Sequence, residues 1–235
     1  SILTHESIPL REENIRQFEE LIDDNKQLLP NGKLRYKIRK GKVYYEIAAV
    51  ARSIKADIIL TGTHGITGFE EYWIGSNAYR IVVNAPCPVI TIRNSFDIER
   101  GIKTILIPID RSSNTTEKLP YAAEMAEVFG AEIHILSLYS TTLKSLRQRV
   151  DIACKKASDY FSDKNLPYIC NSLVADNNSS ATLNYSEEKN IDMIVIMTEQ
   201  EATKSNVFLG QDAQQMVNNS NVPVFNVHPN EKSMK

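Results

Sequence analysis

Short apolar runs alternate along the chain with stretches whose apolar positions recur at helical spacing. Recurrence at i, i+3 and i+4 predicts amphipathic helices, and continuous runs rich in β-branched residues predict strands covered on both faces of a parallel sheet. The helical stripes are Ile15, Phe18 and Ile22; Ile47, Val50 and Ile54; Leu119, Ala122, Ala126 and Phe129; and Leu143, Leu146, Val150, Ala157 and Phe161. The predicted strands cover 58–60, 89–92, 105–107, 133–138, 193–197 and 222–227. This alternation predicts an α/β fold with doubly wound parallel sheets.

The chain also repeats itself. Residues 57–89 align without a gap on residues 192–224 under a shift of 135 positions, and nine of the 33 aligned pairs are identical. The identities cluster at turns and strand starts, which a shared helical pattern alone does not produce. We therefore predict two tandem domains, a first copy at residues 1–97 and a second copy at residues 98–235.

The first copy is shorter than the second at its start. The second copy opens with a strand near Thr104, and the 135-residue shift places the matching strand of the first copy ahead of Ser1. The first copy is therefore expected to lack its opening strand and first helix, with Ile2–His5 as the end of its second strand. Two explanations stay open, namely preceding residues in the native protein or completion of the domain by a partner chain.

Composition narrows the classes of function. The 235 residues are 42% hydrophobic and 24% charged with a net charge of −2, which is typical of a globular protein and argues against a nucleic-acid partner. The sequence has neither an apolar run near 18 residues nor the pattern of a signal peptide, so we expect no membrane partner and a cytoplasmic location. Cys87, Cys154 and Cys170 show no CxxC spacing, which favours idle thiols in a reducing compartment and no metal site.

One loop has the composition of an anion site. It follows the strand at 57–61, starts with Gly62 and Gly65, and ends at Gly75 and Ser76, where a helix is predicted to begin. Glycines permit close backbone approach with amides turned toward an anion, and a helix start favours negative charge. The carboxyl end of a strand is also where open α/β sheets bind ligands.

Plainer interpretations of the same loop stay open. Gly62 and Gly65 also fit a simple turn, and Ser76 also fits a helix cap. His64 is more typical of an exposed loop histidine than of a catalytic residue. The aromatic residues of the loop, Phe69, Tyr72 and Trp73, favour a hydrophobic clasp against the sheet over a base-stacking platform.

The loop resembles the ATP loop of the universal stress protein family. The spacing Gly-x-x-Gly, nine residues, Gly-Ser is that family's signature, and the sequences at 56–60, 86–89 and 107–112 are also similar to it. The resemblance implies strand order 3-2-1-4-5 and pairing of the two copies through their fifth strands, at 89–92 and 224–227. It further implies that ATP, with or without Mg²⁺, is held at the ribose and phosphates, and that Asp110 is an adenine-side residue of the second copy. The residues implied for nucleotide binding are Gly62, Thr63, His64, Gly65, Gly75, Ser76 and Asn77.

The second copy departs from this pattern. In register, Met197 replaces Gly62, Gln200 replaces Gly65 and Gln211 replaces Ser76, so we predict that the second copy holds no nucleotide. Glu199 and Glu201 add negative charge to its loop. The leading hypothesis is an ATP-binding protein of the stress response that is not an enzyme. A tandem scaffold that binds no nucleotide, a slow ATPase and a homo-oligomer stay open.

Overall fold

The structure is a computed structural model that describes residues 7–63, 76–198, 200–202 and 207–229. The chain falls into two units, Ser1–Gly41 and Lys42–Lys235, each described by itself. The interpretation of Ile2–His5 as a strand end lies outside the described residues.

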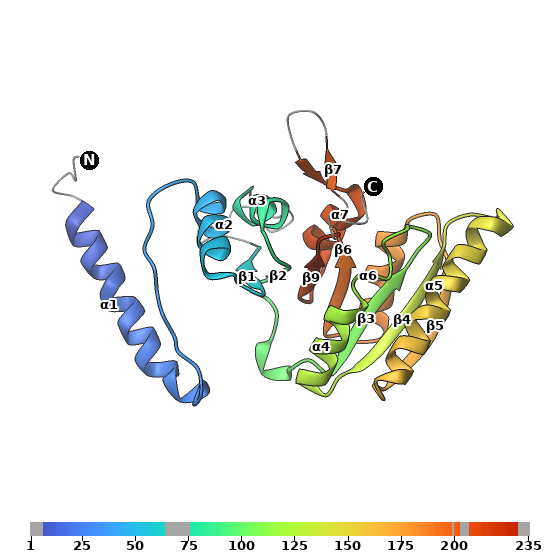
Figure 1. Cartoon of the computed structure of the whole chain (residues 1–235), viewed down its shortest axis with the longest axis horizontal. Helices are drawn as coiled ribbons and strands as arrows, with labels where there is room; N and C mark the ends of the chain where they lie inside the picture. Colours follow the sequence, from blue (N-terminus) through green and yellow to red (C-terminus); the bar gives the residue numbers. More distant parts are fainter. Residues whose placement is uncertain (1–6, 64–75, 199, 203–206, 230–235) are drawn as a thin grey trace. The chain divides into compact units, whose positions relative to one another are not determined.

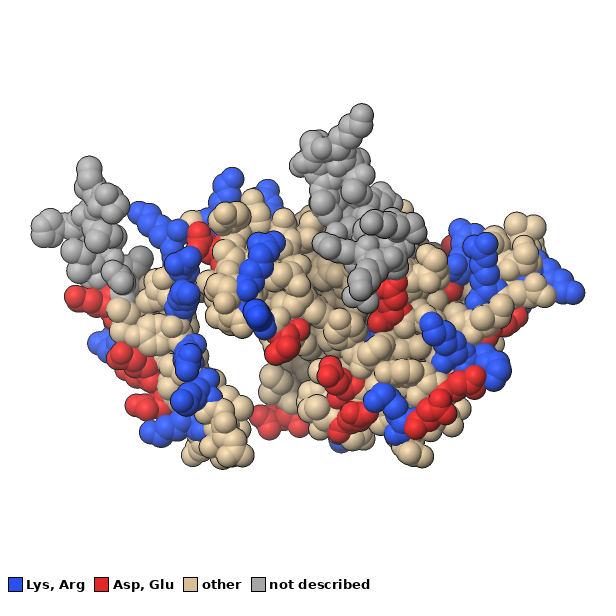
Figure 2. All heavy atoms as spheres, viewed as in Figure 1, with Lys and Arg blue, Asp and Glu red and all other residues tan. Residues whose placement is uncertain are grey.

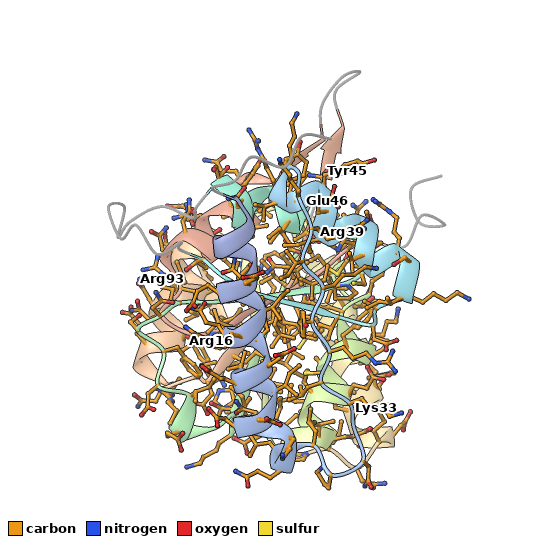
Figure 3. The ribbon with its side chains drawn as sticks, turned by 90° about the vertical axis from the view of Figure 1, so that its left-hand side faces the viewer. Arg16, Lys33, Arg39, Tyr45, Glu46 and Arg93 are labelled. Carbon is orange, nitrogen blue, oxygen red and sulfur yellow. The ribbon has the colours of Figure 1, made fainter. Side chains whose placement is uncertain are left out.

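The first unit is a helix followed by an extended stretch. Helix α1 (Ser7–Asn25) leads through the 3-10 turn η1 (Lys26–Leu28) into backbone without regular structure up to Gly41. Figure 3 shows Arg16 on α1 and Lys33 and Arg39 along the extended stretch. The ring of Phe18 stacks on that of Tyr36 with centroids 5.5 Å apart, which joins the two parts of the unit.

The second unit is built on a seven-stranded sheet (Figure 1). The sheet strands are β1 (Ile59–Gly62), β2 (Val89–Ile92), β3 (Thr104–Ile109), β4 (Glu132–Tyr139), β5 (Tyr168–Val174), β6 (Met193–Met197) and β9 (Val224–Val227), in the order β1-β2-β9-β6-β3-β4-β5. The helices are α2 (Val43–Ile54), α3 (Ser76–Asn84), the 3-10 turn η2 (Ile98–Arg100), α4 (Leu119–Phe129), α5 (Lys144–Asp163), α6 (Asn178–Glu188) and α7 (Gln211–Asn219). Strands β7 (Gln200–Ala202) and β8 (Val207–Leu209) form a separate hairpin.

Helices cover both faces of the sheet. One hydrophobic cluster joins apolar residues of α3, α6 and α7 to the sheet, and the other joins α4 and α5 to its opposite face. Strands β3, β4, β6 and β9 of the second copy are buried on both faces, and Ile105, Ile107 and Ile133 are fully enclosed. Such burial is the reason that their sequences are continuous apolar runs rather than alternating ones. The predicted doubly wound architecture is confirmed.

The second copy has the predicted strand order. Its five strands, numbered along the chain, are β3, β4, β5, β6 and β9, and they lie as β5-β4-β3-β6-β9, which is 3-2-1-4-5. All neighbours within this set are parallel. Among the described residues, the first copy contributes β1 and β2, which are also parallel to each other.

The two copies join through their fifth strands, as predicted. Strand β2 pairs with β9 in the antiparallel sense, with Ile90 opposite Phe225 and Thr91 opposite Val224. The Asn226 amide donates to the carbonyl oxygen of Val89 at 3.1 Å. One sheet therefore runs through both copies, and the proposed boundary at residue 97 stays a prediction.

Parts of the sequence-based description were incomplete. Strand β1 is half exposed, with Leu60 at 62% exposure, because the described residues place no strand beside its outer edge. It was expected to be covered on both faces. Strand β5 and helix α6 were not anticipated, because neither carries a continuous apolar run or a clear apolar stripe. The loop after β6 contains the hairpin β7–β8, which the sequence analysis did not anticipate.

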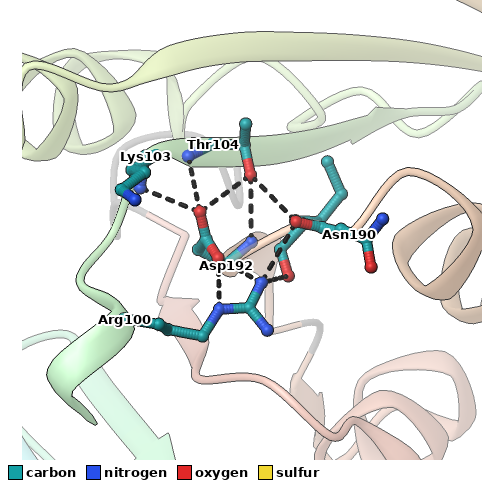
Figure 4. Close-up of polar contacts among 6 residues, drawn as sticks. Arg100, Lys103, Thr104, Asn190 and Asp192 are labelled. Atoms are coloured by element: carbon teal, nitrogen blue, oxygen red, sulfur yellow. Dashed lines mark hydrogen bonds and ion pairs between the residues drawn. The ribbon is translucent and has the colours of Figure 1, made fainter. Parts of the chain in front are cut away.

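A buried carboxylate fixes the start of the second copy (Figure 4). Asp192 precedes β6 and is 5% exposed. Its Oδ2 accepts hydrogen bonds from the backbone N–H groups of Lys103 at 2.9 Å and Thr104 at 3.0 Å. Its Oδ1 accepts from Arg100 Nε at 2.7 Å, and Arg100 Nη2 also contacts it. The linker, β3 and β6 are therefore joined at one point.

Candidate functional site

The loop with the anion-site composition connects β1 to α3. Gly62 is the last residue of β1, paired with Ile92, and it is exposed. Ser76 and Asn77 are the first two residues of α3, and both are exposed. The first backbone N–H groups of a helix have no partner within the helix, so this end of α3 offers donors and a positive dipole to an anion. The helix predicted to follow the loop is confirmed, and Ser76 is the first of its residues that the structure describes.

Thr63 differs from its neighbours in the candidate set. It is 3% exposed, and its backbone N–H donates to the carbonyl oxygen of Ile92 at 3.0 Å. Its amide is therefore engaged in the sheet rather than directed at a ligand. His64, Gly65 and Gly75 lie outside the described residues, as does the aromatic segment with Phe69, Tyr72 and Trp73.

The equivalent place in the second copy is a polar cavity of about 260 Å³. It lies where the carboxyl ends of β3 and β6 meet the first turns of α6 and α7. The residues of the cavity that carry its chemistry are Asp110, Ser112, Thr115, Lys118, Asn178, Met197, Gln211 and Asp212. The site geometry predicted by the doubly wound fold, at strand carboxyl ends, is thus present in the second copy.

Lys118 places a buried amine beside this cavity. The side chain is 3% exposed, and Nζ donates to the carbonyl oxygen of Thr115 at 2.8 Å and to Thr115 Oγ1 at 3.4 Å. Burial lowers the pKa of Lys118 to about 8, and the negative charge of Asp110 opposes that shift. The sequence analysis missed this residue, because a single lysine before a predicted helix carries no signal of burial.

Asp110 is engaged in its own loop. Its Oδ1 accepts hydrogen bonds from the Ser112 N–H at 3.1 Å and from Ser112 Oγ at 2.5 Å. Its backbone N–H donates to Thr115 Oγ1 at 3.2 Å. These contacts close the turn between β3 and α4, which agrees with a structural role for this aspartate in the second copy.

A further carboxylate lies in the first turn of α7. Asp212 lines the cavity, and its Oδ1 accepts a hydrogen bond from Ser179 Oγ at 2.6 Å. In the 135-residue register Asp212 occupies the position of Asn77. That correspondence was the sequence signal for Asp212, whereas the charge predicted for this loop was assigned to Glu199 and Glu201. Glu199 lies outside the described residues, and Glu201 belongs to β7.

The electrostatics of the second-copy cavity disfavour a triphosphate. Two carboxylates, Asp110 and Asp212, line the cavity together with one buried amine, and they would repel an anion of several charges at short range. Met197 adds a side chain where the first copy has Gly62, which reduces the space for close backbone contact. The arrangement suits a neutral or donor-rich group better than phosphates.

Residues 4–93 match the universal stress protein family. They contain the loop from Gly62 to Ser76 together with β1, α3 and β2. This part of the chain belongs to the universal stress protein family. The match ends before the second copy.

Two curated relatives are similar to part of the universal stress protein domain. A universal stress protein of Methanocaldococcus jannaschii is 39% identical over 61 residues, which are 26% of this chain and 36% of that protein. A universal stress protein of Thermus aquaticus is 35% identical over 54 residues, 23% of this chain and 39% of that protein. The chain thus spans little more than a third of the length of these relatives.

A solved structure extends the likeness to nearly the whole chain. A universal stress protein from Archaeoglobus fulgidus superposes with a TM-score of 0.73 and 17% identity, covering 98% of this chain and 82% of that one. At this identity the likeness concerns the fold. It supports the α/β architecture described above for both copies.

The remaining surface and composition add three observations. On the face drawn in Figure 2, basic and acidic side chains are interspersed over the second unit, whereas basic side chains follow one another along the extended stretch of the first unit. Among the described residues, no helix is long and apolar enough to cross a membrane. The same residues contain no group of three histidine, cysteine, aspartate or glutamate side chains placed to hold a metal ion.

Proposed function

We propose that this universal stress protein binds an adenine nucleotide, ATP, at the segment from Gly62 to Ser76 and acts in the stress response without turning the nucleotide over. The observation that carries the proposal is that the matched family region contains the full Gly-x-x-Gly, nine residues, Gly-Ser spacing, which connects the end of β1 to the start of α3. Exposed residues at both ends of this connection, Gly62 and Ser76, leave room for a ligand to approach the backbone.

The chemistry of the start of α3, the loop glycines and Thr63 gives each of them a role in the proposed site. The start of α3 binds phosphate oxygens through backbone N–H groups and the Ser76 hydroxyl. The glycines at 62, 65 and 75 permit the backbone to reach the phosphates without a Cβ in the way. Thr63 holds the end of β1 against β2 and thereby positions the loop, without contacting the nucleotide itself.

The alternative function is a scaffold that binds no nucleotide. The observation that favours it is the continuous sheet through β2 and β9, which joins the copies whether or not a ligand is present. Nucleotide binding and scaffolding make different predictions for substitutions in the loop.

The test compares the same substitution at two equivalent positions. Gly75→Asp places a carboxylate at the proposed anion site, and we expect it to reduce ATP affinity at least about 10-fold. The matched control is Gly210→Asp, at the N-cap of α7, where aspartate is a favourable cap and affinity should not change. Affinity is measured by titration calorimetry and folding by thermal melting.

Each outcome is informative. Loss of binding in Gly75→Asp with an unchanged melting curve supports the proposal. Equal ATP affinity in the folded Gly75→Asp variant and the wild type would assign the loop a structural role and favour the scaffold. Equal losses in both variants would place the nucleotide elsewhere.

A further inference from the structure

Two cysteines that are separate in the sequence lie on facing elements of the second copy. Cys154 belongs to α5, whose buried residues Val150, Ala157 and Phe161 form its inward stripe. Cys154 falls within that stripe, four residues after Val150 and three before Ala157, and it packs against the cluster between α4, α5 and the sheet. Its side chain therefore points toward the sheet.

Cys170 lies on the face of β5 that α5 covers. It is paired in register with Ile135 of β4, and paired residues of neighbouring strands share a face. Ile135 belongs to the cluster that contains Cys154. The next residue of β5, Asn171, donates to Tyr185 Oη of α6 at 2.9 Å, which places the alternate residues of β5 on the opposite face.

Cys154 lies close enough to Cys170 to affect the ionisation of its thiol. Burial raises the pKa of Cys170, and the charge of Cys154 and a side-chain hydrogen bond from it raise that pKa further. All three cysteines are free thiols, and Cys87 is buried before β2, away from this pair. Cys154 and Cys170 are scattered in the sequence, but they are neighbours in the structure because folding brings α5 and β5 together.

We propose that Cys154 and Cys170 are a redox-active pair that forms a reversible disulfide joining α5 to the edge strand β5. Cys170 is exposed and Cys154 is partly buried, so a small oxidant meets Cys170 first. The oxidant is a low-molecular-weight disulfide of the glutathione class.

The reaction proceeds in two exchanges. The Cys170 thiolate attacks one sulfur of the small disulfide, which forms a mixed disulfide and releases one small thiolate. The Cys154 thiolate then attacks the Cys170 sulfur and releases the second small thiolate. Two protein thiols are oxidised, one small disulfide is reduced to two thiols, and the two protons pass from the protein to the released thiolates.

The bond would act on the least supported part of the sheet. Strand β5 ends the strand order and most of its residues are exposed. A covalent link to α5 would restrain this edge and reduce the freedom of the unfolded chain. We expect the Tm of the oxidised protein to exceed that of the reduced protein by roughly 5 °C.

The test oxidises the native full-length chain with glutathione disulfide and maps thiols by alkylation and peptide mass spectrometry. We expect the loss of two thiols, a linked peptide pair containing Cys154 and Cys170, and reversal by dithiothreitol. The rate should rise with pH, because the thiolate of Cys170 attacks. Cys87→Ser should behave as the wild type.

Single substitutions resolve the order of events. Cys154→Ser should stop at a stable glutathione adduct on Cys170, whereas Cys170→Ser should form no linked peptide and react at least about 10-fold more slowly at Cys154. A wild-type protein that accumulates adducts without the link would overturn the proposal. So would linkage through Cys87, or native thiols that stay unreacted while the urea-unfolded chain is oxidised.

Discussion

Asp192 shows how one residue organises the second copy. Its carboxylate binds the backbone of Lys103 and Thr104 and the side chain of Arg100, so the linker, β3 and β6 depend on it. These contacts, opposed by burial, lower the pKa of Asp192 below its ordinary value. Its repeat counterpart Asp57 is exposed at the equivalent place. The same residue type therefore has different surroundings in the two copies.

Asp192→Asn is expected to lower the free energy of unfolding by roughly 2–3 kcal/mol at pH 7, because charge-assisted hydrogen bonds are lost and buried donors are left poorly matched. Asp57→Asn is the matched control and should change stability by less than about 0.5 kcal/mol. Urea denaturation of both variants measures the difference. Similar effects at the two positions would show that the network around Asp192 contributes little.

Elements of the two copies also meet away from the sheet. After β9, His228 Nε2–H donates to the carbonyl oxygen of Val82 in α3 at 2.7 Å. Nδ1 of His228 is buried and has no partner among the described residues. Burial lowers the pKa of His228 below its usual 6.5. The neutral imidazole is thus the form that joins β9 to α3.

The stability of the protein should consequently fall in mild acid. A folded-state pKa below the unfolded value means that stability is fully present above about pH 6.5 and is lost as pH falls through the folded pKa. His228 contributes a slope of at most about 1.4 kcal/mol per pH unit in that window. His228→Gln keeps a donor for Val82 and should show a shallower loss between pH 7 and pH 5 by urea denaturation. An identical pH profile in the wild type and the variant would exclude this contribution. Burial also lowers the pKa of His134, but His134 is present in both proteins and does not affect the comparison.

At the scale of the whole molecule, the antiparallel pairing of β2 and β9 makes one sheet from two repeats. One copy of this joined sheet carries the loop with the family spacing. The other copy carries the cavity lined by Asp110, Lys118 and Asp212. The two corresponding loop positions of the repeat have therefore diverged in charge, while β2 and β9 still pair with each other.

This divergence predicts the stoichiometry of binding. Calorimetry on the full-length chain should find at most one ATP per chain, because Asp110, Asp212 and Met197 make the second-copy cavity unsuited to phosphates. The Gly75→Asp variant should then show no ATP-binding heat. Two equivalent sites per chain would mean that the second cavity accepts nucleotide despite its carboxylates.

The sequence alone determined the class of fold and the strands that join the copies. Runs such as 105–107 and 133–138 are apolar because both faces of the sheet are covered, so that each position of the strand favours an apolar residue. The repeat identified β2 and β9 as equivalent strands of the two copies, and these strands were predicted to pair with each other. The prediction of a helix after the glycine-containing loop was equally local, because it rests on the chemistry of a helix terminus.

Only the tertiary structure decided what long-range packing creates. Strand β5 is a mixed polar segment that becomes a strand because β4 offers it a paired edge. Lys118 is buried, and Cys154 meets Cys170, through contacts between elements that no local pattern encodes. Asp57 and Asp192 look identical in sequence, yet their burial differs because Arg100, Lys103 and Thr104 surround only the second. Periodicity reports which face of an element is buried, whereas the partner across that face is set by how the chain closes on itself.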